Sequence, residues 1–259
     1  MSTILETRNL TMRFGGLTAV SEFSASIPQG SITGLIGPNG AGKTTCFNMI
    51  TGFYRPTEGQ VFFQGRELTG KSPHQVCRAG IARTFQNIRL FGNETALENV
   101  MIGNFVRQKT GWVQSVLMLP ASFSEERAIR TRGMELLDVV GLADIAGEKA
   151  NSLPYGAQRR LEIARALATQ PHFLLLDEPA AGMNPQESLE LMEFIRTIRS
   201  RFDLTILLIE HDMKVVMGVC EHIWVLDYGV TIAEGSPSAI QSNPKVIEAY
   251  LGEEYVQHA

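Results

Sequence analysis

The sequence predicts an α/β fold: a parallel or mixed sheet with helices, an antiparallel β subdomain and an inserted helical subdomain. Residues 173–176 (FLLL) and 205–209 (TILLI) are short apolar runs, typical of strands buried on both faces of a parallel sheet. Residues 3–27 alternate apolar and polar, which indicates two antiparallel strands. Residues 96–147 have apolar positions three and four apart, as in helices.

The length of 259 residues allows one large α/β domain or two modest ones. No linker rich in Gly, Ser or Pro separates two halves, and no internal repeat is found. We therefore expect a single domain over residues 1–259. Its core would comprise residues 1–85 and 160–259, and its helical subdomain residues 86–159.

Charge and cysteine content exclude several classes of protein. The formal net charge of −4 argues against nucleic acid as a partner. The three cysteines, Cys46, Cys77 and Cys220, are too far apart for a disulfide framework or a zinc site, which fits a reducing cytosol. No stretch approaches the ~18 apolar residues of a membrane span, and the N-terminus has no signal-peptide pattern. Any membrane role is expected from the cytoplasmic side, through a partner.

The most specific motif is GPNGAGKTT, which fits the phosphate-loop pattern G-x-x-x-x-G-K-[ST] at every fixed position. It comprises Gly37, Pro38, Asn39, Gly40, Ala41, Gly42, Lys43, Thr44 and Thr45. A predicted strand precedes it and a predicted helix follows, so backbone N–H groups and the helix dipole can meet phosphate oxygens. Lys43 would reach the terminal phosphates of a bound nucleoside triphosphate, and the Thr44 hydroxyl would bind Mg²⁺. The alternative is a glycine-rich turn between strand and helix.

Two adjacent carboxylates, Asp177 and Glu178, follow the apolar run at residues 173–176. Ligands bind at the carboxyl ends of parallel strands, and alternation gives neighbouring side chains different surroundings. Asp177 is the candidate for the Mg²⁺ shell, and Glu178 for the general base that activates water. The pair could instead cap the following helix.

Four single residues carry weaker signals. Phe14, at the end of the first strand, could stack on adenine or belong to the core. Gln86 could reach Mg²⁺ or the attacking water, or lie on the surface. His211 could stabilise the γ-phosphate or be an ordinary surface histidine. Gly156 could open a second anion site or simply begin a helix.

Residues 105–123 are aromatic-rich, basic and interrupted by Pro120. They could form a partner-facing or membrane-surface segment, or a helix that packs its own apolar side. Ser124 is expected to cap the helix that follows.

The order of these motifs resembles an ABC-type ATPase subunit over nearly the whole chain. More narrowly, RFGGLTAV, GFYRPTEG, RTFQNIRLF, YGAQRRLEIARAL, LLDEPAAGMNP, LLIEHDM and YLGE look like the ATP-binding subunit of branched-chain amino-acid importers. The resemblance implies a head-to-tail pair of subunits. In such a pair the signature segment of one subunit completes the ATP site of the other.

The resemblance also implies roles for individual residues. Phe14 matches the adenine-stacking aromatic, and residues 37–45 match the phosphate cradle. The implied catalytic residues are Lys43, Gln86 (the lid glutamine), Glu178 and His211 (the switch histidine). The implied Mg²⁺ ligands are Thr44, Gln86 and Asp177. The implied trans contacts to ATP are Leu153, Tyr155, Gly156 and Ala157.

The signature segment departs from the family pattern. LSGGQ is replaced by LPYGA, which keeps only the leucine and the second glycine. The serine hydroxyl is lost, and Pro154 lacks a backbone N–H. Asn184 also stands where the family commonly has Asp.

The expected function is that of an ATPase subunit whose ATP binding and hydrolysis drive transport through separate membrane subunits. The substrate implied by the resemblance is a branched-chain or related amino acid. Implied partners are a second ATPase subunit, identical or different, integral membrane permeases and, indirectly, a substrate-binding protein. The implied location is the cytoplasmic face of the inner membrane, as a peripheral subunit. The alternatives are a lipid-export ATPase and a soluble ABC ATPase that acts outside transport.

Overall fold

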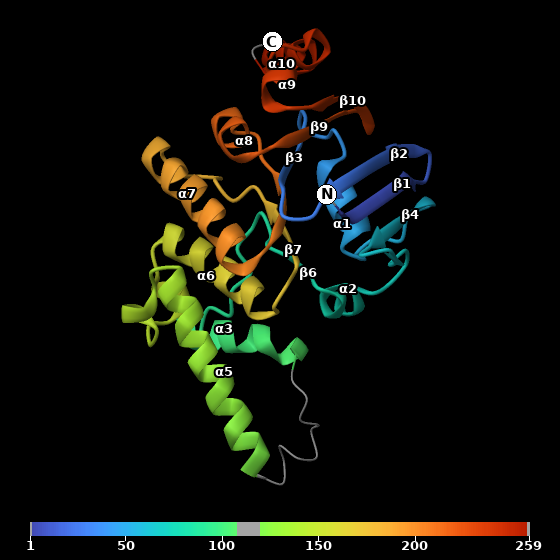
Figure 1. Cartoon of the computed structure of the whole chain (residues 1–259). Coiled ribbons are helices and arrows are strands. Elements are labelled where there is room, and N and C mark those ends of the chain that lie inside the picture. The colour runs from blue at the N-terminus through green and yellow to red at the C-terminus, as the bar shows by residue number, and fades with distance from the viewer. Residues whose placement is uncertain (1, 108–119, 258–259) are drawn as a thin grey trace. The chain divides into compact units, whose positions relative to one another are not determined.

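A computed structural model describes residues 2–107 and 120–257 of the chain (Figure 1). The contacts divide it into two compact units. The first unit comprises Met1–Arg83 with His172–Ala259, and the second comprises Thr84–Pro171. The first unit therefore contains the phosphate loop, the acid pair and His211, and the second contains Gln86 and the signature segment.

The first unit opens with an antiparallel sheet in the order β2-β1-β4-β5. Its strands are β1 (Thr3–Phe14), β2 (Leu17–Pro28), β4 (Glu58–Phe63) and β5 (Arg66–Glu67). Along β2, Phe23, Ala25 and Ile27 are buried while the serines between them are exposed. This alternation buries one face of the sheet and leaves the other in water, as the sequence pattern predicts.

The second sheet of this unit has the order β10-β9-β3-β8-β7-β6. Its strands are β3 (Ile32–Ile36), β6 (Ile81–Arg83), β7 (Phe173–Asp177), β8 (Thr205–Ile209), β9 (His222–Asp227) and β10 (Val230–Gly235). All pairs are parallel except that of β9 with β10. Every residue of β3, β7 and β8 is buried. This confirms the two-face burial predicted from the apolar runs of β7 and β8.

One hydrophobic cluster joins both sheets through the helix that follows the phosphate loop, α1 (Lys43–Ile50). It combines Leu5 and Phe23 of the antiparallel sheet with Phe47 of α1 and Phe173 and Ile209 of the central sheet. Because α1 is held by core packing on both sides, its N-terminus has a fixed position relative to the central strands.

The other helices of the first unit begin at polar caps. They are α2 (Pro73–Ala79), α7 (Pro185–Phe202), α8 (Met213–Val219), α9 (Pro237–Gln241) and α10 (Pro244–Gln257). Asn184 is the N-cap of α7, and its side chain accepts hydrogen bonds from the N–H groups of Gln186 and Glu187. An amide oxygen caps a helix about as well as a carboxylate, so Asn in place of Asp preserves this start.

The second unit is helical. It contains α3 (Ala96–Asn104), α5 (Pro120–Val139), α6 (Tyr155–Ala168) and the 3₁₀ turns η1 (Phe105–Arg107), η2 (Ala143–Ile145) and η3 (Ala150–Ser152). Thr95 and Glu98 form a capping box at the start of α3. Asn99 is fully buried, and its amide donates to the carbonyls of Phe91 and Thr95 at 3.0 Å each. The loop before α3 is thereby fastened to the helix.

The prediction that Ser124 caps a helix is wrong. The helix α5 begins at Pro120, so Ser124 lies inside it. Proline suits the first turn, because its fixed φ is helical and its missing N–H would have no partner there. Most of the segment 105–123, whose partner-facing role was left open, lies outside the described residues.

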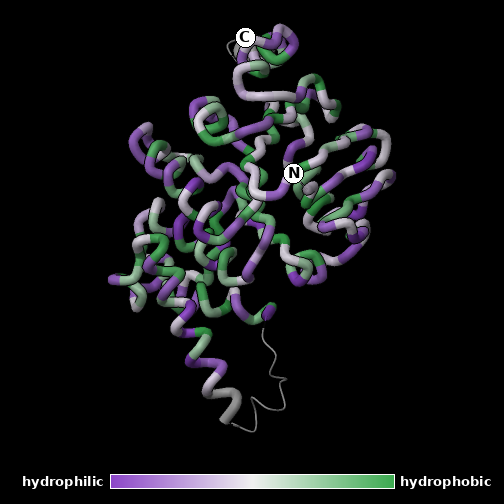
Figure 2. The backbone as a smooth tube through the Cα atoms, viewed as in Figure 1, coloured by the Kyte–Doolittle hydropathy of each residue, from purple (hydrophilic) through white to green (hydrophobic). Residues whose placement is uncertain are grey.

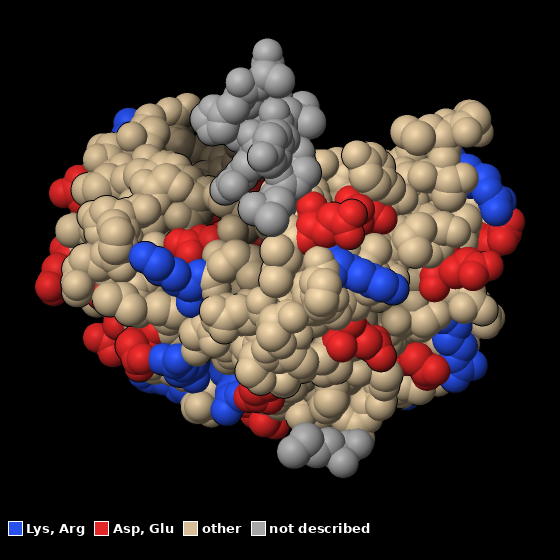
Figure 3. All heavy atoms as spheres, turned by 90° about the horizontal axis from the view of Figure 1, so that it is seen from above, with Lys and Arg blue, Asp and Glu red and all other residues tan. Residues whose placement is uncertain are grey.

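None of the helices in the described ranges is long and apolar enough to cross a membrane. Hydrophilic and hydrophobic residues alternate along α5 and α7 (Figure 2). On the face drawn in Figure 3, Asp and Glu side chains are interspersed with Lys and Arg.

Substitution of two phosphate-loop glycines tests how tightly the loop is packed. Gly37 has φ 146°, and an added Cβ would lie 2.0 Å from the carbonyl oxygen of Leu226. Gly40 has φ 80°, but an added Cβ would meet nothing within 4 Å. Gly40→Ala should cost about 1–2 kcal/mol of unfolding free energy through backbone strain alone. Gly37→Ala should cost about 1–3 kcal/mol more because of the clash. Urea unfolding measures both, and equal losses would contradict the packing.

Candidate nucleotide site

The phosphate loop connects β3 to α1, and it changes direction at glycines with positive φ. Gly42 has φ 100° and is the N-cap of α1. Lys43 is buried, and its Nζ donates to the carbonyl oxygens of Gly37 at 2.6 Å and Pro38 at 2.8 Å. These bonds hold the ammonium against the loop itself. A phosphate bound by the loop would therefore meet a positive charge that is already in place.

The turn between β9 and β10 supports this loop. The N–H of Gly229 donates to the carbonyl of Ala41 at 3.0 Å, and the carbonyl of Gly229 accepts from the N–H of Ser21 at 2.8 Å. Sequence reasoning missed this support. The Tyr228-Gly229 dipeptide between two strands predicts a turn, but nothing local says what the turn contacts.

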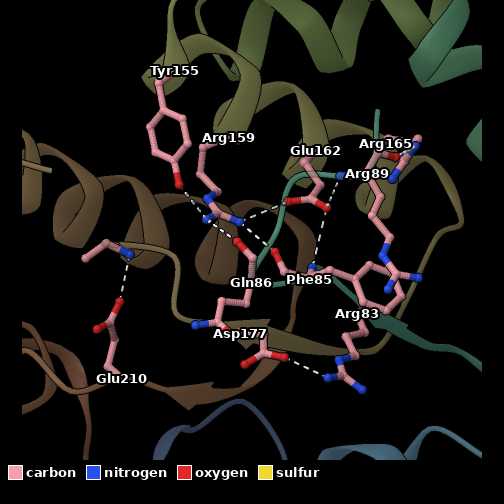
Figure 4. A network of polar contacts seen from close by, with 11 residues as sticks. Arg83, Phe85, Gln86, Arg89, Tyr155, Arg159, Glu162, Arg165, Asp177 and Glu210 are labelled. Carbon is pink, nitrogen blue, oxygen red and sulfur yellow. Dashed lines mark hydrogen bonds and ion pairs between the residues drawn. The ribbon is translucent and has the colours of Figure 1, made fainter. Parts of the chain in front are cut away.

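Asp177 ends β7 in a buried ion pair with Arg83 of β6. Its Oδ2 accepts from Arg83 Nη2 at 2.6 Å, and the two side chains are 4% and 6% exposed (Figure 4). Arg83 Nη1 also donates to Asn48 of α1 at 2.7 Å. The guanidinium of Arg83 therefore connects Asp177, the predicted Mg²⁺ ligand, to α1, the helix that follows the phosphate loop. The sequence analysis did not single out Arg83, because its partner lies on a strand that is distant in the chain.

Glu178 leaves the strand with φ 48°, a left-handed conformation that is uncommon for a residue with a side chain. Its N–H donates to the carbonyl of Ile209 at 2.9 Å. Its carboxylate lies 3.8 Å from His211 Nδ1, so two residues predicted separately come together. Strain of this kind is common at functional sites, where surrounding bonds maintain it.

Glu210 joins the loops that follow β7 and β8. It is fully buried, and its Oε1 accepts from the N–H of Ala180 at 2.6 Å (Figure 4). Its Oε2 accepts from the N–H groups of His211 at 3.0 Å and Asp212 at 3.3 Å. Burial raises the pKa of Glu210, and these three hydrogen bonds oppose that shift. Glu210 was missed by the sequence analysis, although an acid directly after a buried strand was a visible signal.

Phe14 is 43% exposed, so its alternative role as a core residue is wrong. Its ring meets Tyr54 edge to face, with centroids 5.4 Å apart. Tyr54 is a second exposed aromatic beside it that the sequence analysis did not single out. An exposed aromatic pair offers the flat apolar surface on which a nucleobase stacks.

The remaining predicted residues belong to the second unit. Tyr155 is the first residue of α6, and Gly156 follows it, while Leu153 and Ala157 are buried. Arg159 of α6 donates to the carbonyl of Gln86 at 2.8 Å and to the Tyr155 hydroxyl at 3.0 Å. The structure therefore links Gln86 to the signature segment through an arginine to which the sequence analysis assigned no role.

The residues available to a metal are oxygen donors. Among the described residues no group of three or more His, Cys, Asp or Glu side chains could hold a metal by itself. The Thr44 hydroxyl and the Asp177 carboxylate of the first unit fit Mg²⁺, which takes few protein oxygens and fills its shell with phosphates and water.

A parallel sheet with a phosphate loop after β3 and an acid pair after β7 defines a P-loop nucleoside triphosphatase. Comparison with known proteins narrows the class. The profile described as "ABC transporter" matches residues 20–181. The profile described as "Branched-chain amino acid ATP-binding cassette transporter" matches residues 230–256.

Two relatives are similar over almost their whole length. The chain is 48% identical over 250 residues to the high-affinity branched-chain amino acid transport ATP-binding protein LivG of Salmonella typhimurium. It is 46% identical over 250 residues to the corresponding protein BraF of Pseudomonas aeruginosa. Each match covers 96% of this chain and 98% of the relative.

Among solved structures, the ADP conformation of MJ1267, an ATP-binding cassette of an ABC transporter, superposes with a TM-score of 0.85 at 33% identity. That match covers 97% of this chain and 100% of the other. The chain thus belongs to the ABC transporter family, and it is an ATP-binding and ATP-hydrolysing subunit.

Glu210→Gln tests the junction between the two loops. The amide keeps one acceptor oxygen but turns an NH₂ donor toward other N–H donors, so about 1–3 kcal/mol of unfolding free energy should be lost. Turnover of ATP should also fall, because the N–H groups of Ala180 and His211 lose their shared anchor. Urea unfolding and phosphate release measure the two effects. Glu248→Gln, at an exposed glutamate of α10, is the control and should change neither.

The effect of Glu210→Gln should depend on pH. Because burial raises the pKa of Glu210, its neutral form stabilises the folded state. That contribution is present below the ordinary pKa of 4.5 and is lost as pH rises through the folded value. The stability of the original protein relative to the variant should therefore decrease as pH rises above 4.5. A difference that increases with pH would contradict the assignment.

Proposed function

We propose that this chain is the ATPase subunit of an importer for branched-chain or related amino acids. The observation that carries the proposal is the near-full-length match to LivG and BraF, whose names state high-affinity branched-chain amino acid transport. The match of residues 230–256 to a profile with the same substrate in its description supports it.

The proposed domain is a single ABC ATPase over residues 1–259. The sequence placed its helical subdomain at residues 86–159, whereas the second unit of the structure comprises Thr84–Pro171 and includes the whole of α6. The proposed partners are a second ATPase subunit, identical or different, and integral membrane permeases. A substrate-binding protein would act through the permeases. The proposed location is the cytoplasmic face of the inner membrane, where the subunit is held by its partners.

For the first half of the ATP site, we propose that Phe14 stacks on adenine and that residues 37–45 surround the phosphates. Mg²⁺ would be held by Thr44, Gln86 and Asp177, and it would neutralise charge on the β- and γ-phosphates. The support is chemical: the Lys43 ammonium already lies against the loop, and the Asp177 carboxylate is fixed by Arg83.

For catalysis, we propose that Glu178 accepts the proton of the water that attacks the γ-phosphate. The Glu178 side chain is 18% exposed, so water can reach it. His211, whose Nδ1 lies 3.8 Å away, would bind the γ-phosphate and orient the carboxylate. Lys43 would stabilise the transferred group, and the amide oxygen of Gln86 would contact the attacking water. The second half of the site would come in trans from Leu153, Tyr155, Gly156 and Ala157 of another subunit.

Glu178→Gln tests the general base. The variant should still bind ATP, because Lys43 and Thr44 remain, but it should lose hydrolysis by on the order of 10²-fold or more. Binding of a fluorescent ATP analogue and steady-state phosphate release separate the two effects. Glu126→Gln, at an exposed position on α5, is the control. Unchanged turnover in Glu178→Gln would exclude Glu178 as the base.

Uptake measurements test the transport function. Deletion of the gene should reduce uptake of labelled leucine, isoleucine and valine, and expression of the original protein should restore it. Glu178→Gln should not restore uptake, because import requires ATP hydrolysis. Subunits recovered with the chain from detergent should be permeases. Normal uptake in the deletion strain, or recovery with lipid-export components, ribosomes or DNA, would favour one of the alternative ABC functions.

A further inference from the structure

Arg159 is a charged side chain with no exposed surface, in the first turns of α6. Its guanidinium donates to the carbonyls of Phe85 at 2.7 Å and Gln86 at 2.8 Å, and to the Tyr155 hydroxyl at 3.0 Å (Figure 4). Its charge is balanced by Glu162, whose Oε2 lies 3.2 Å from Nη1. A buried guanidinium is costly unless its donors are satisfied. Nη1 and Nη2 of Arg159 have these partners, whereas its buried Nε has no hydrogen-bond partner among the described residues.

The same face of α6 also hydrogen-bonds other main-chain groups of residues 85–89, the segment that contains Gln86. Glu162 Oε1 accepts from the N–H groups of Phe85 and Arg89, each at 3.4 Å. Arg165, one further turn along α6, donates to the carbonyl of Arg89. Residues three apart on a helix lie on one face, so this face fixes both ends of residues 85–89.

The hydrogen bonds from Arg159 connect Gln86 to Tyr155, and this connection is buried in the middle and exposed at both ends. Arg159 and Glu162 are buried, whereas Gln86 and Tyr155 are exposed, the latter by 46%. Tyr155 lies next to Gly156, which we propose to face the nucleotide of a second subunit. It also occupies the position at which the family signature has a glycine, and only a side chain there can supply a hydroxyl to Arg159.

We propose that Tyr155 and Arg159 are positioning residues that couple the signature segment to the Gln86 loop of the same subunit. The idea rests on the proposed function, because it needs a nucleotide that meets the signature segment in trans. Such a nucleotide restrains Tyr155. The planar guanidinium has its donors in a fixed fork, so a restrained hydroxyl restrains the carbonyls of Phe85 and Gln86 too. The position of Gln86, which acts at the ATP site of its own subunit, is thereby fixed when the signature segment of that subunit binds the nucleotide of the other subunit.

Tyr155→Phe removes only the hydroxyl, and Arg159→Lys keeps the charge but loses the fork. The matched control is Arg201→Lys, at an exposed arginine of α7. Hydrogen exchange is measured with and without ATP and Mg²⁺ on full-length protein carrying Glu178→Gln, which keeps ATP intact. The amides of residues 85–89 report the coupling, and those of residues 37–45 report nucleotide binding.

With Glu178→Gln alone, ATP should slow exchange in both segments. When Tyr155→Phe or Arg159→Lys is added, slowing at residues 37–45 should persist, while slowing at residues 85–89 should fall at least about threefold. A merely structural role would raise exchange at residues 85–89 with and without ATP, so an unchanged ATP-dependent difference there overturns the proposal. Absence of any slowing with Glu178→Gln alone would instead indicate failure of the proposed function.

Kinetics on the protein with Glu178 intact provide the second arm. Tyr155→Phe should lower kcat by roughly three- to tenfold with little change in KM, because the lost bond acts on catalytic geometry and not on binding. In a double-mutant cycle, Tyr155→Phe and Arg159→Lys should be non-additive, because they interrupt one connection. Additive effects, or a change in KM alone, would overturn the proposal.

Discussion

The register of three adjacent parallel strands determines where the residues of the candidate nucleotide site lie. Strand β8 lies between β3 and β7, and its last residue, Ile209, pairs with Leu35 of one and Asp177 of the other. The phosphate loop, Glu178 and His211 therefore leave the sheet at one edge. A shift of one residue would move a loop by about 3.3 Å and turn its side chains to the other face. Burial of all three strands on both faces makes such a shift costly.

Buried charges then fix the loops that leave this edge. Arg83 holds Asp177, and Glu210 holds the N–H groups of Ala180 and His211. In the second unit, Arg159 holds the carbonyls of Phe85 and Gln86. Buried ionic groups contribute little net stability, because desolvation offsets their attraction. Their contribution here is geometric. Arg83 fixes the carboxylate at the end of β7, while Glu210 and Arg159 bind main-chain groups of segments that lie outside helices and strands.

The altered signature segment illustrates the difference between a motif and a site. Compared with LSGGQ, the sequence LPYGA has lost a serine hydroxyl and a glycine. In the structure, Pro154 is the N-cap of α6 and Tyr155 its first helical residue, with a hydroxyl that accepts from Arg159. A hydroxyl is therefore still present at the start of this helix. It is one residue later in the chain, and it accepts a hydrogen bond from Arg159, which also binds the Gln86 carbonyl.

The sequence by itself determined the strand order along the chain, the phosphate loop, the acid pair and the resemblance to ABC ATPases. Those features are local: period-two alternation, continuous apolar runs and a glycine pattern each depend on a few consecutive residues. Only the tertiary structure decided the partners of Arg83, Glu210 and Arg159, and the support that Gly229 gives the phosphate loop. Asp177 is 94 positions from Arg83, and Arg159 is 73 from Gln86. Contacts between such distant segments arise from sheet order and helix packing, which leave no short-range pattern in one sequence.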